Sequence, residues 1–227
     1  MSAQKTTKPS SKPFWNPGSA AEVNETSFVA VDGMQTALER PSLLLHSCCG
    51  PCSSAVIFQV AADYQVTIYF YNPNITDKDE YELRKTSQIQ LIEAINKDPD
   101  VPYKINFKEG PYDRQRFIEA TADFSNEPEG GKRCNVCFRL RLEKTAETAL
   151  EMGYDFFGTT LSVSPHKDYD TISHIGRRLA QTYGVSFLDR NFKKNGGYQQ
   201  SIVLSKKYGL YRQNFCGCDY SKPKNEK

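Results

Sequence analysis

The stretch LLLHSCCGPCSSAVIFQVAA, residues 43–62, holds both a fold signal and a chemical signal. Its first four residues are a short apolar run of the kind that forms a buried strand, and residues 53–62 have the pattern of a helix. A turn containing glycine, proline and three cysteines separates the two. The stretch therefore predicts a strand–turn–helix unit with thiols at the end of the strand.

The same alternation continues outward along the chain. Residues 66–71 are rich in β-branched and aromatic side chains, as strands are, and Thr76 is a candidate cap for the long helix that follows. Further strands are predicted at 103–107, 154–159 and 185–188, and further helices at 112–122, 134–152, 170–183 and 198–208. This order predicts an α/β fold, a Rossmann-like (HUP-like) parallel sheet flanked by helices.

Three parts of the chain are expected to differ in character. Residues 1–26 are rich in Ser, Thr, Lys, Pro and Asn and are predicted to be a flexible N-terminal tail. Residues 27–221 are predicted to form a single α/β catalytic domain, whose cysteine-containing C-terminal tail folds over the site. Residues 222–227 are predicted to be a flexible C-terminus.

Composition excludes several classes of protein. No apolar run in the 227 residues approaches the roughly 18–20 needed to cross a bilayer, and the N-terminus lacks the apolar core of a secretory signal, so we expect a cytoplasmic protein without membrane contact. The formal net charge of +2 is too small to indicate nucleic-acid binding by itself. Glu80 and Arg84, four residues apart, are expected to form an ordinary surface ion pair.

All seven cysteines fall in clusters: Cys48, Cys49 and Cys52, then Cys134 and Cys137, then Cys216 and Cys218. A thioredoxin-like thiol–disulfide oxidoreductase needs only the pair at 49 and 52. A structural zinc site or a cubane iron–sulfur cluster takes four ligands, which leaves three thiols over. The count favours a cluster plus a further metal or redox function, and iron over zinc, with the three stretches converging at one edge of the sheet.

Five motifs together make the chain similar to the epoxyqueuosine reductases of the QueH type. They are LLLHSCCGPC at 43–52, YFYNPNITDKDEYELR at 69–84, EPEGGKRCNVCFRLRLEKTAETA at 127–149, FFGTTLSVSPHKDYDTISHIG at 156–176 and LYRQNFCGCDYS at 210–221. The resemblance implies an oxidoreductase that reduces the epoxide of epoxyqueuosine at the tRNA wobble position to queuosine, the last step of queuosine biosynthesis.

The resemblance also implies a cofactor and partners. It implies a 4Fe-4S cluster with an additional adjacent iron and no cobalamin, fed by an unidentified low-potential electron donor. Six cysteines are the expected ligands of this cofactor, the cluster and its adjacent iron taken together: Cys48, Cys49, Cys134, Cys137, Cys216 and Cys218. In this family the position of Cys52 is sometimes aspartate, which implies that Cys52 binds the second metal.

Opening an epoxide requires a proton donor and a means of holding the substrate. The candidate donors are His166, Asp168 and Tyr211. The candidate contacts to tRNA carrying epoxyqueuosine are Arg212 and Gln213 beside the last cysteines, then Asn72, Asn74, Lys132, Arg133 and Arg139. A zinc-stabilised RNA-binding protein and a thiol–disulfide oxidoreductase remain alternatives. A nucleotide-activating tRNA thiolase is disfavoured, because the chain has no Gly-rich phosphate motif.

Overall fold

A computed structural model describes residues 40–222, and at their centre lies a five-stranded sheet. Its strand order is β3-β2-β1-β4-β5, and every neighbouring pair is parallel. This order is typical of a Rossmann-like, doubly wound sheet, so the predicted fold class is confirmed. The strands are β1 Ser42–His46, β2 Gln65–Phe70, β3 Asn106–Glu109, β4 Phe156–Thr159 and β5 Ser186–Phe187.

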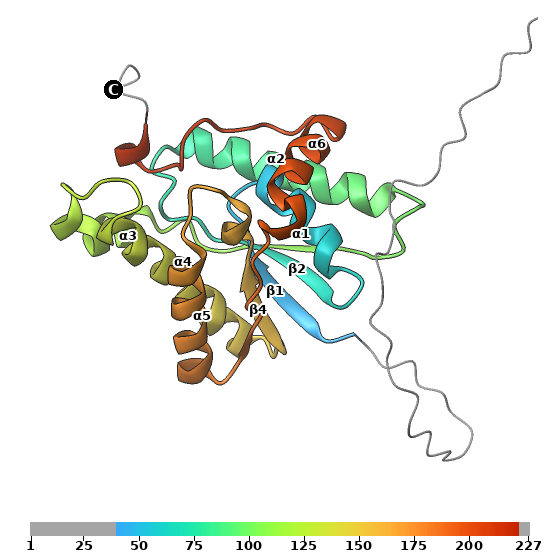
Figure 1. Cartoon of the computed structure of the whole chain (residues 1–227), viewed down its shortest axis with the longest axis horizontal. Coiled ribbons are helices and arrows are strands. Elements are labelled where there is room, and N and C mark those ends of the chain that lie inside the picture. Colours follow the sequence, from blue (N-terminus) through green and yellow to red (C-terminus); the bar gives the residue numbers. More distant parts are fainter. Residues whose placement is uncertain (1–39, 223–227) are drawn as a thin grey trace, which may run out of the picture. The chain divides into compact units, whose positions relative to one another are not determined.

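Helices cover both faces of the sheet (Figure 1). One face carries α1, α2 and α6, and the other carries α4 and α5. Alternate residues of β1 supply the two cores: Leu43 and Leu45 pack toward the first group of helices and Leu44 toward the second. A strand buried on both faces has no polar side, which explains the uninterrupted apolar run. The helices are α1 Gly50–Val60, α2 Lys78–Lys97, α3 Arg114–Thr121, α4 Lys132–Glu151, α5 Tyr169–Tyr183 and α6 Gly197–Lys207.

The helix starts differ from the sequence prediction by one to three residues, and two of these differences have a clear physical cause. The cap of α2 is Asp77 and not Thr76, because the Asp77 carboxylate accepts hydrogen bonds from the backbone N–H groups of Asp79 and Glu80. Helix α1 begins at Gly50, three residues earlier than predicted. Proline is tolerated in the first turn of a helix, and a Cβ at Gly50 would lie 2.8 Å from a backbone oxygen of α2, so only glycine permits this approach.

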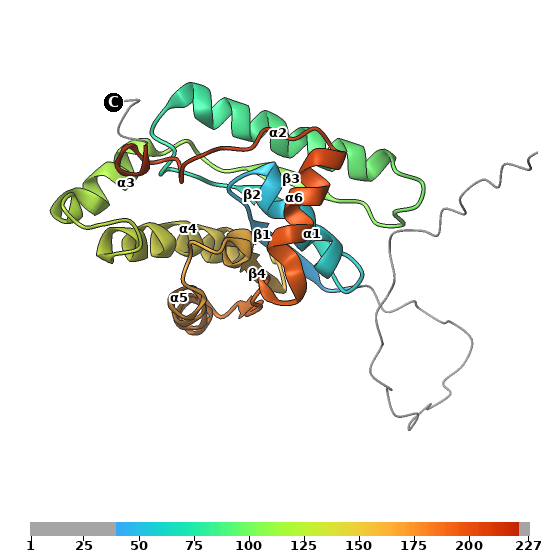
Figure 2. The same ribbon diagram turned by 45° about the horizontal axis from the view of Figure 1, so that its top comes forward.

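The C-terminal segment, residues 208–222, runs from the end of α6 alongside α2 (Figure 2). Gly217 has φ +118°, a conformation that favours glycine, and its backbone oxygen accepts from the backbone N–H of Thr76 at 3.1 Å. This tight bend brings Cys216 and Cys218 back toward the sheet.

Several predictions concern chain ends that lie outside the described residues. These are the flexible tail at 1–26, the first part of the domain predicted at 27–221, and all of the flexible C-terminus except Lys222. Within the described part of the chain, none of the helices has the length and apolar character that a membrane span requires.

Candidate metal and substrate site

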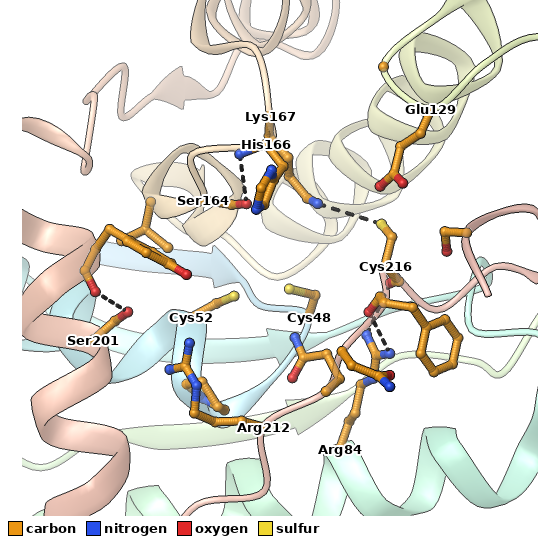
Figure 3. A pocket seen from close by; sticks show the side chains of 18 of the residues that line it. Cys48, Cys52, Arg84, Glu129, Ser164, His166, Lys167, Ser201, Arg212 and Cys216 are labelled. Carbon is orange, nitrogen blue, oxygen red and sulfur yellow. Dashed lines mark hydrogen bonds between the residues drawn. The ribbon is translucent and has the colours of Figure 1, made fainter. Parts of the chain in front are cut away.

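A cavity of about 540 Å³ opens beyond the carboxyl ends of β1 and β4. The strand order reverses between these two strands, and doubly wound sheets bind ligands at this point. The turn after β1 contributes Cys48 and Cys52 to the lining, and the loop after β4 contributes residues 163, 164, 166 and 167. The C-terminal segment closes one side with residues 212–216 (Figure 3).

The first three cysteines form a compact group of sulfur atoms. The Sγ atoms of Cys48, Cys49 and Cys52 all lie within 4.8 Å of one another, and Cys48 and Cys49 are 3.8 Å apart. In the part of the chain that the structure describes, no other set of three metal-ligating side chains is so close. Cys49 is also the N-cap of α1, so the group lies at the positive end of a helix dipole.

This packing of thiols limits how many can ionise. Sulfur hydrogen bonds from Cys49 and Cys52 hold the pKa of Cys48 well below its usual value, whereas burial raises the pKa of Cys49 to about 12. The pKa of Cys52 is also raised, because its thiol is hydrogen-bonded to the Cys48 sulfur. Burial and mutual hydrogen bonding therefore favour the protonated forms of Cys49 and Cys52, and a bound cation would favour all three as thiolates.

The other four cysteines surround a second cavity of about 20 Å³. Cys134 and Cys137 share one face of α4, and Cys216 and Cys218 approach from the C-terminal segment. Cys216 lines the large cavity as well as this small one. All three cysteine stretches therefore meet around two adjoining cavities.

Nitrogen donors point at the sulfur atoms. The Gln213 side-chain amide donates to Cys49 Sγ at 3.0 Å, and the Gly130 backbone N–H donates to Cys134 Sγ at 3.2 Å. Lys167 Nζ lies 3.5 Å from Cys216 Sγ (Figure 3). Although burial opposes its charged form, the sulfurs of Cys216 and Cys48 raise the pKa of Lys167, so it is a cation at neutral pH.

The chemistry of this donor set fits a metal–sulfur centre. Sulfur ligands prefer zinc, copper(I) and iron–sulfur clusters, and clusters are stabilised by hydrogen bonds to their sulfur atoms. Here soft ligands, half-buried nitrogen donors and the buried positive charge of Arg141 occur together. Cysteine thiolates bound to a metal would accept hydrogen bonds from these donors and would balance this positive charge.

Of the three candidate proton donors, only His166 lines the large cavity. Asp168 caps α5, accepting the backbone N–H of Thr171 at 2.8 Å, and hydrogen bonding from Thr171 lowers its pKa. It is therefore ionised and has no proton to donate at neutral pH. The Tyr211 hydroxyl donates to Glu80 at 2.7 Å, and Tyr211 is not among the residues that line the cavity.

The candidate substrate contacts of the C-terminal segment and of the loop after β2 lie in different surroundings. Arg212 and Gln213 line the large cavity. Asn72 is completely buried and donates to the backbone oxygen of Ser47 at 2.9 Å, so it joins two strand-end loops and does not face the cavity. Asn74 lines the small cavity among the cysteines, and its Oδ1 has no hydrogen-bond partner.

The candidates near the second cysteine pair are placed differently. Lys132 and Arg139 are exposed on α4 and line neither cavity. Arg133 is only 4% exposed, and it donates to backbone oxygens of Phe124, Ser125 and Glu127 while its guanidinium stacks on Tyr220. Arg133 therefore fastens the preceding loop and has no surface to offer an RNA.

Sequence reasoning missed three cations. Arg84 is not a surface residue, since it is 1% exposed and Glu80 is also buried. Arg141 is 1% exposed between the two cavities, and Lys167 is half-buried beside Cys216. The sequence held only two weak signs that these cations lie at the site. Arg141 stands four residues after Cys137, on the same helix face, and Lys167 follows His166.

The fold and site define a class: an α/β protein with a sulfur-lined, cation-rich cavity at the switch point of a parallel sheet. Residues 43–224 match the family model described as epoxyqueuosine reductase QueH, and the chain belongs to this family. It is 39% identical to epoxyqueuosine reductase QueH of Streptococcus pyogenes serotype M1, over 80% of this chain and 71% of that protein. It is 38% identical to the Thermotoga maritima protein of the same name, over 79% of this chain and 90% of that one.

Proposed function

We propose that the chain is an iron–sulfur epoxyqueuosine reductase that acts on the wobble nucleotide of tRNA. The observation that supports the proposal is that six of the seven cysteines line two adjoining cavities, with the seventh, Cys49, in contact with Cys48, in a chain of this family. In the reaction both epoxide C–O bonds break, and two electrons and two protons are consumed. The oxygen leaves as water, and a carbon–carbon double bond remains.

The proposed cofactor is a 4Fe-4S cluster with an adjacent iron, and no cobalamin. Cys48, Cys49, Cys134, Cys137, Cys216 and Cys218 are the proposed cluster-site ligands, and Cys52 is proposed to bind the further iron. When bound, this centre supplies low-potential electrons and a Lewis acid for the epoxide oxygen. The electrons come from a low-potential donor that the residues do not identify.

The protein's own groups supply the proton and the geometry. His166 is exposed at the mouth of the cavity, where an imidazole nitrogen can pass a proton from solvent to the departing oxygen. Asp168 and Tyr211 are not retained for this role, because each has a structural partner outside the cavity. Gln213 Oε1 is buried without a hydrogen-bond partner and can accept from the substrate.

The size and mouth of the cavity suit a nucleotide that is turned out of an RNA loop. Proteins read single-stranded RNA loops by binding unstacked bases and by contacts to the phosphates. The cavity volume of about 540 Å³ lies in the range of small-molecule sites, and Arg212 stands at its edge. We propose Arg212 as the nearest phosphate contact and the exposed Lys132 and Arg139 as outer contacts. A cytoplasmic location, where tRNA and reducing conditions occur together, stays a prediction.

The test is anaerobic incubation of the iron-loaded protein with tRNA carrying epoxyqueuosine and a low-potential reductant. Nucleoside mass analysis should show loss of one oxygen atom, and metal analysis should give several irons per chain. A colourless protein with one zinc would support the zinc-stabilised RNA-binding alternative. An iron-free protein that reduces disulfides would support a thiol–disulfide oxidoreductase.

A further inference from the structure

Arg141 is a buried cation without a carboxylate partner among the described residues. Its side chain is 1% exposed, Nε donates to the Cys137 backbone oxygen at 3.2 Å, and Nη2 has no hydrogen-bond partner. None of the ion pairs within residues 40–222 includes it. It lines both cavities, so the unpartnered nitrogen lies where the three cysteine stretches meet.

Lys167 is a second cation of the same kind. Its ammonium group approaches Cys216 Sγ at 3.5 Å and, like Arg141, it has no carboxylate partner in the part of the chain described. It lines the large cavity from the loop after β4, on the side opposite to α2 (Figure 3). The buried Arg84 differs, because its charge is balanced by Glu80 at 2.6 Å.

A buried positive charge requires a nearby negative one. Arginine cannot release its proton, and a charge removed from water without a partner is strongly destabilising. The sulfur of Cys216 lies 3.5 Å from Lys167 Nζ, and the cysteine sulfurs line both cavities with Arg141. Glu129 also lines both cavities, but its carboxylate forms no ion pair with either cation among the described residues. Ionised sulfur, or what sulfur holds, is therefore the nearest source of the compensating charge.

We infer that Arg141 and Lys167 are positioning residues that bind the negative charge of the loaded metal–sulfur centre and raise its reduction potential. The inference rests on the proposed function, because it concerns the cofactor proposed there. Reduction adds an electron, and nearby cations and hydrogen bonds to sulfur stabilise the more negative, reduced state. Removing either cation should therefore make reduction harder.

The experiment is a redox titration of the anaerobically loaded protein, followed by electron paramagnetic resonance and by iron analysis. Arg141→Gln and Lys167→Gln remove a charge at similar size, and Arg141→Lys retains it. Arg139→Gln is the matched control, since it removes an exposed arginine from the same helix. We expect the two glutamine variants at 141 and 167 to shift the midpoint to more negative potential, and Arg141→Lys and Arg139→Gln to stay near the wild type.

Each result decides between the possibilities. Unshifted potentials in fully loaded Arg141→Gln and Lys167→Gln overturn the inference alone, as does an equal shift in Arg139→Gln. If Arg141→Gln does not fold, the same titration of Lys167→Gln tests the inference, because Lys167 is only half-buried. If a glutamine variant at 141 binds less iron, Arg141→Lys must restore it, and failure to do so overturns an electrostatic role. A wild-type protein that binds no iron overturns the proposed function, and the inference with it.

Discussion

The seven cysteines differ in what surrounds each sulfur. Cys137 is buried, and burial raises its pKa to about 12. It therefore stays a thiol until a metal binds the sulfur and displaces the proton. Cys134, three residues earlier, is half-buried and accepts a hydrogen bond from the Gly130 backbone N–H. A sulfur that already accepts a backbone donor is oriented for ligation before the metal arrives.

We therefore expect Cys134→Ala to lose iron and activity together. The turnover of epoxyqueuosine tRNA should fall by more than about 100-fold, because loss of even an outer-shell partner of a metal ligand costs 10–100-fold. Asn135→Ala, an exposed change between the two cysteines, is the control and should keep both. Iron content and single-turnover assays measure the outcome. A Cys134→Ala protein with full iron content would refute the ligand role.

Arg84 of helix α2 binds the C-terminal segment beside its cysteines. Arg84 Nε pairs with Glu80 at 2.6 Å, while its two terminal nitrogens donate to the backbone oxygens of Cys216 and Phe215 at 3.0 and 3.1 Å. The guanidinium also lies over the Phe215 ring. An ion pair on α2 thus fixes the position of a cysteine that comes from the far end of the chain.

Arg84→Gln should release this segment. We expect the free energy of unfolding to fall by about 3–5 kcal/mol, because Glu80 is left buried without its partner. Amide exchange of residues 214–218 should increase and iron binding should weaken. Lys85→Gln, its neighbour at the surface of α2, should change neither property by a comparable amount. Unchanged exchange in Arg84→Gln would contradict the fastening role.

Helix α5 is joined to the chain after β5 by Asp189. Its carboxylate accepts from Tyr169 at 2.8 Å, from Ser173 at 2.8 Å and from Arg177 at 2.5 Å. Burial opposes the charged form, but these hydrogen bonds outweigh it and lower the pKa of Asp189. A carboxylate with a lowered pKa stabilises the fold above its unfolded pKa, and this contribution is lost as the pH falls through the folded pKa.

Asp189→Asn should therefore be less stable than the wild type at pH 7, by about 1–3 kcal/mol. The two proteins should converge as the pH falls below about 4, where the unfolded carboxyl group takes up its proton. Urea denaturation across this pH range measures the difference. Asp63→Asn, an exposed change in the turn after α1, should show no such convergence. A constant gap at all pH values would contradict the role of the charge.

The chain as a whole carries a formal net charge of only +2, so the proposed attraction for RNA must come from local positive charge. Arg212 is exposed at the edge of the large cavity, with one guanidinium nitrogen donating to Ser205 at 3.1 Å. This bond holds the guanidinium in place at the edge of the cavity. A fixed charge at the mouth positions a phosphate better than a freely rotating one.

Arg212→Gln should weaken binding of an anticodon stem-loop and lower its dependence on salt. Loss of one phosphate contact reduces the slope of log K against log salt concentration by about 0.7–0.9. Fluorescence anisotropy at several salt concentrations measures the slope. Arg178→Gln removes an exposed arginine of α5 that lines no cavity, and its slope should match the wild type. Equal slopes for both variants would exclude Arg212 as a phosphate contact.

Local patterns were sufficient for the strands, the helices and the clustering of the cysteines. A strand buried on both faces requires a continuous apolar run, and two cysteines on one helix face require Cys-x-x-Cys spacing. Both patterns involve only residues close together in the sequence, so the sequence alone predicts them. The exact ends of the helices and strands were not predicted from these local patterns. The start of α1 depends on the close approach of α2 to Gly50, and the neighbours of a residue in sequence do not show such an approach.

The roles of the charged residues were decided by contacts across the fold. Glu80 and Arg84 have the spacing of a surface ion pair, yet both are buried because the C-terminal segment covers them. Arg133 lies in a basic stretch of the kind that contacts RNA, yet its guanidinium donates to three backbone oxygens of the preceding loop. Hydrophobic periodicity is a property of adjacent residues, whereas the environment of a charge depends on which distant segments exclude water from it, and only the assembled chain specifies those.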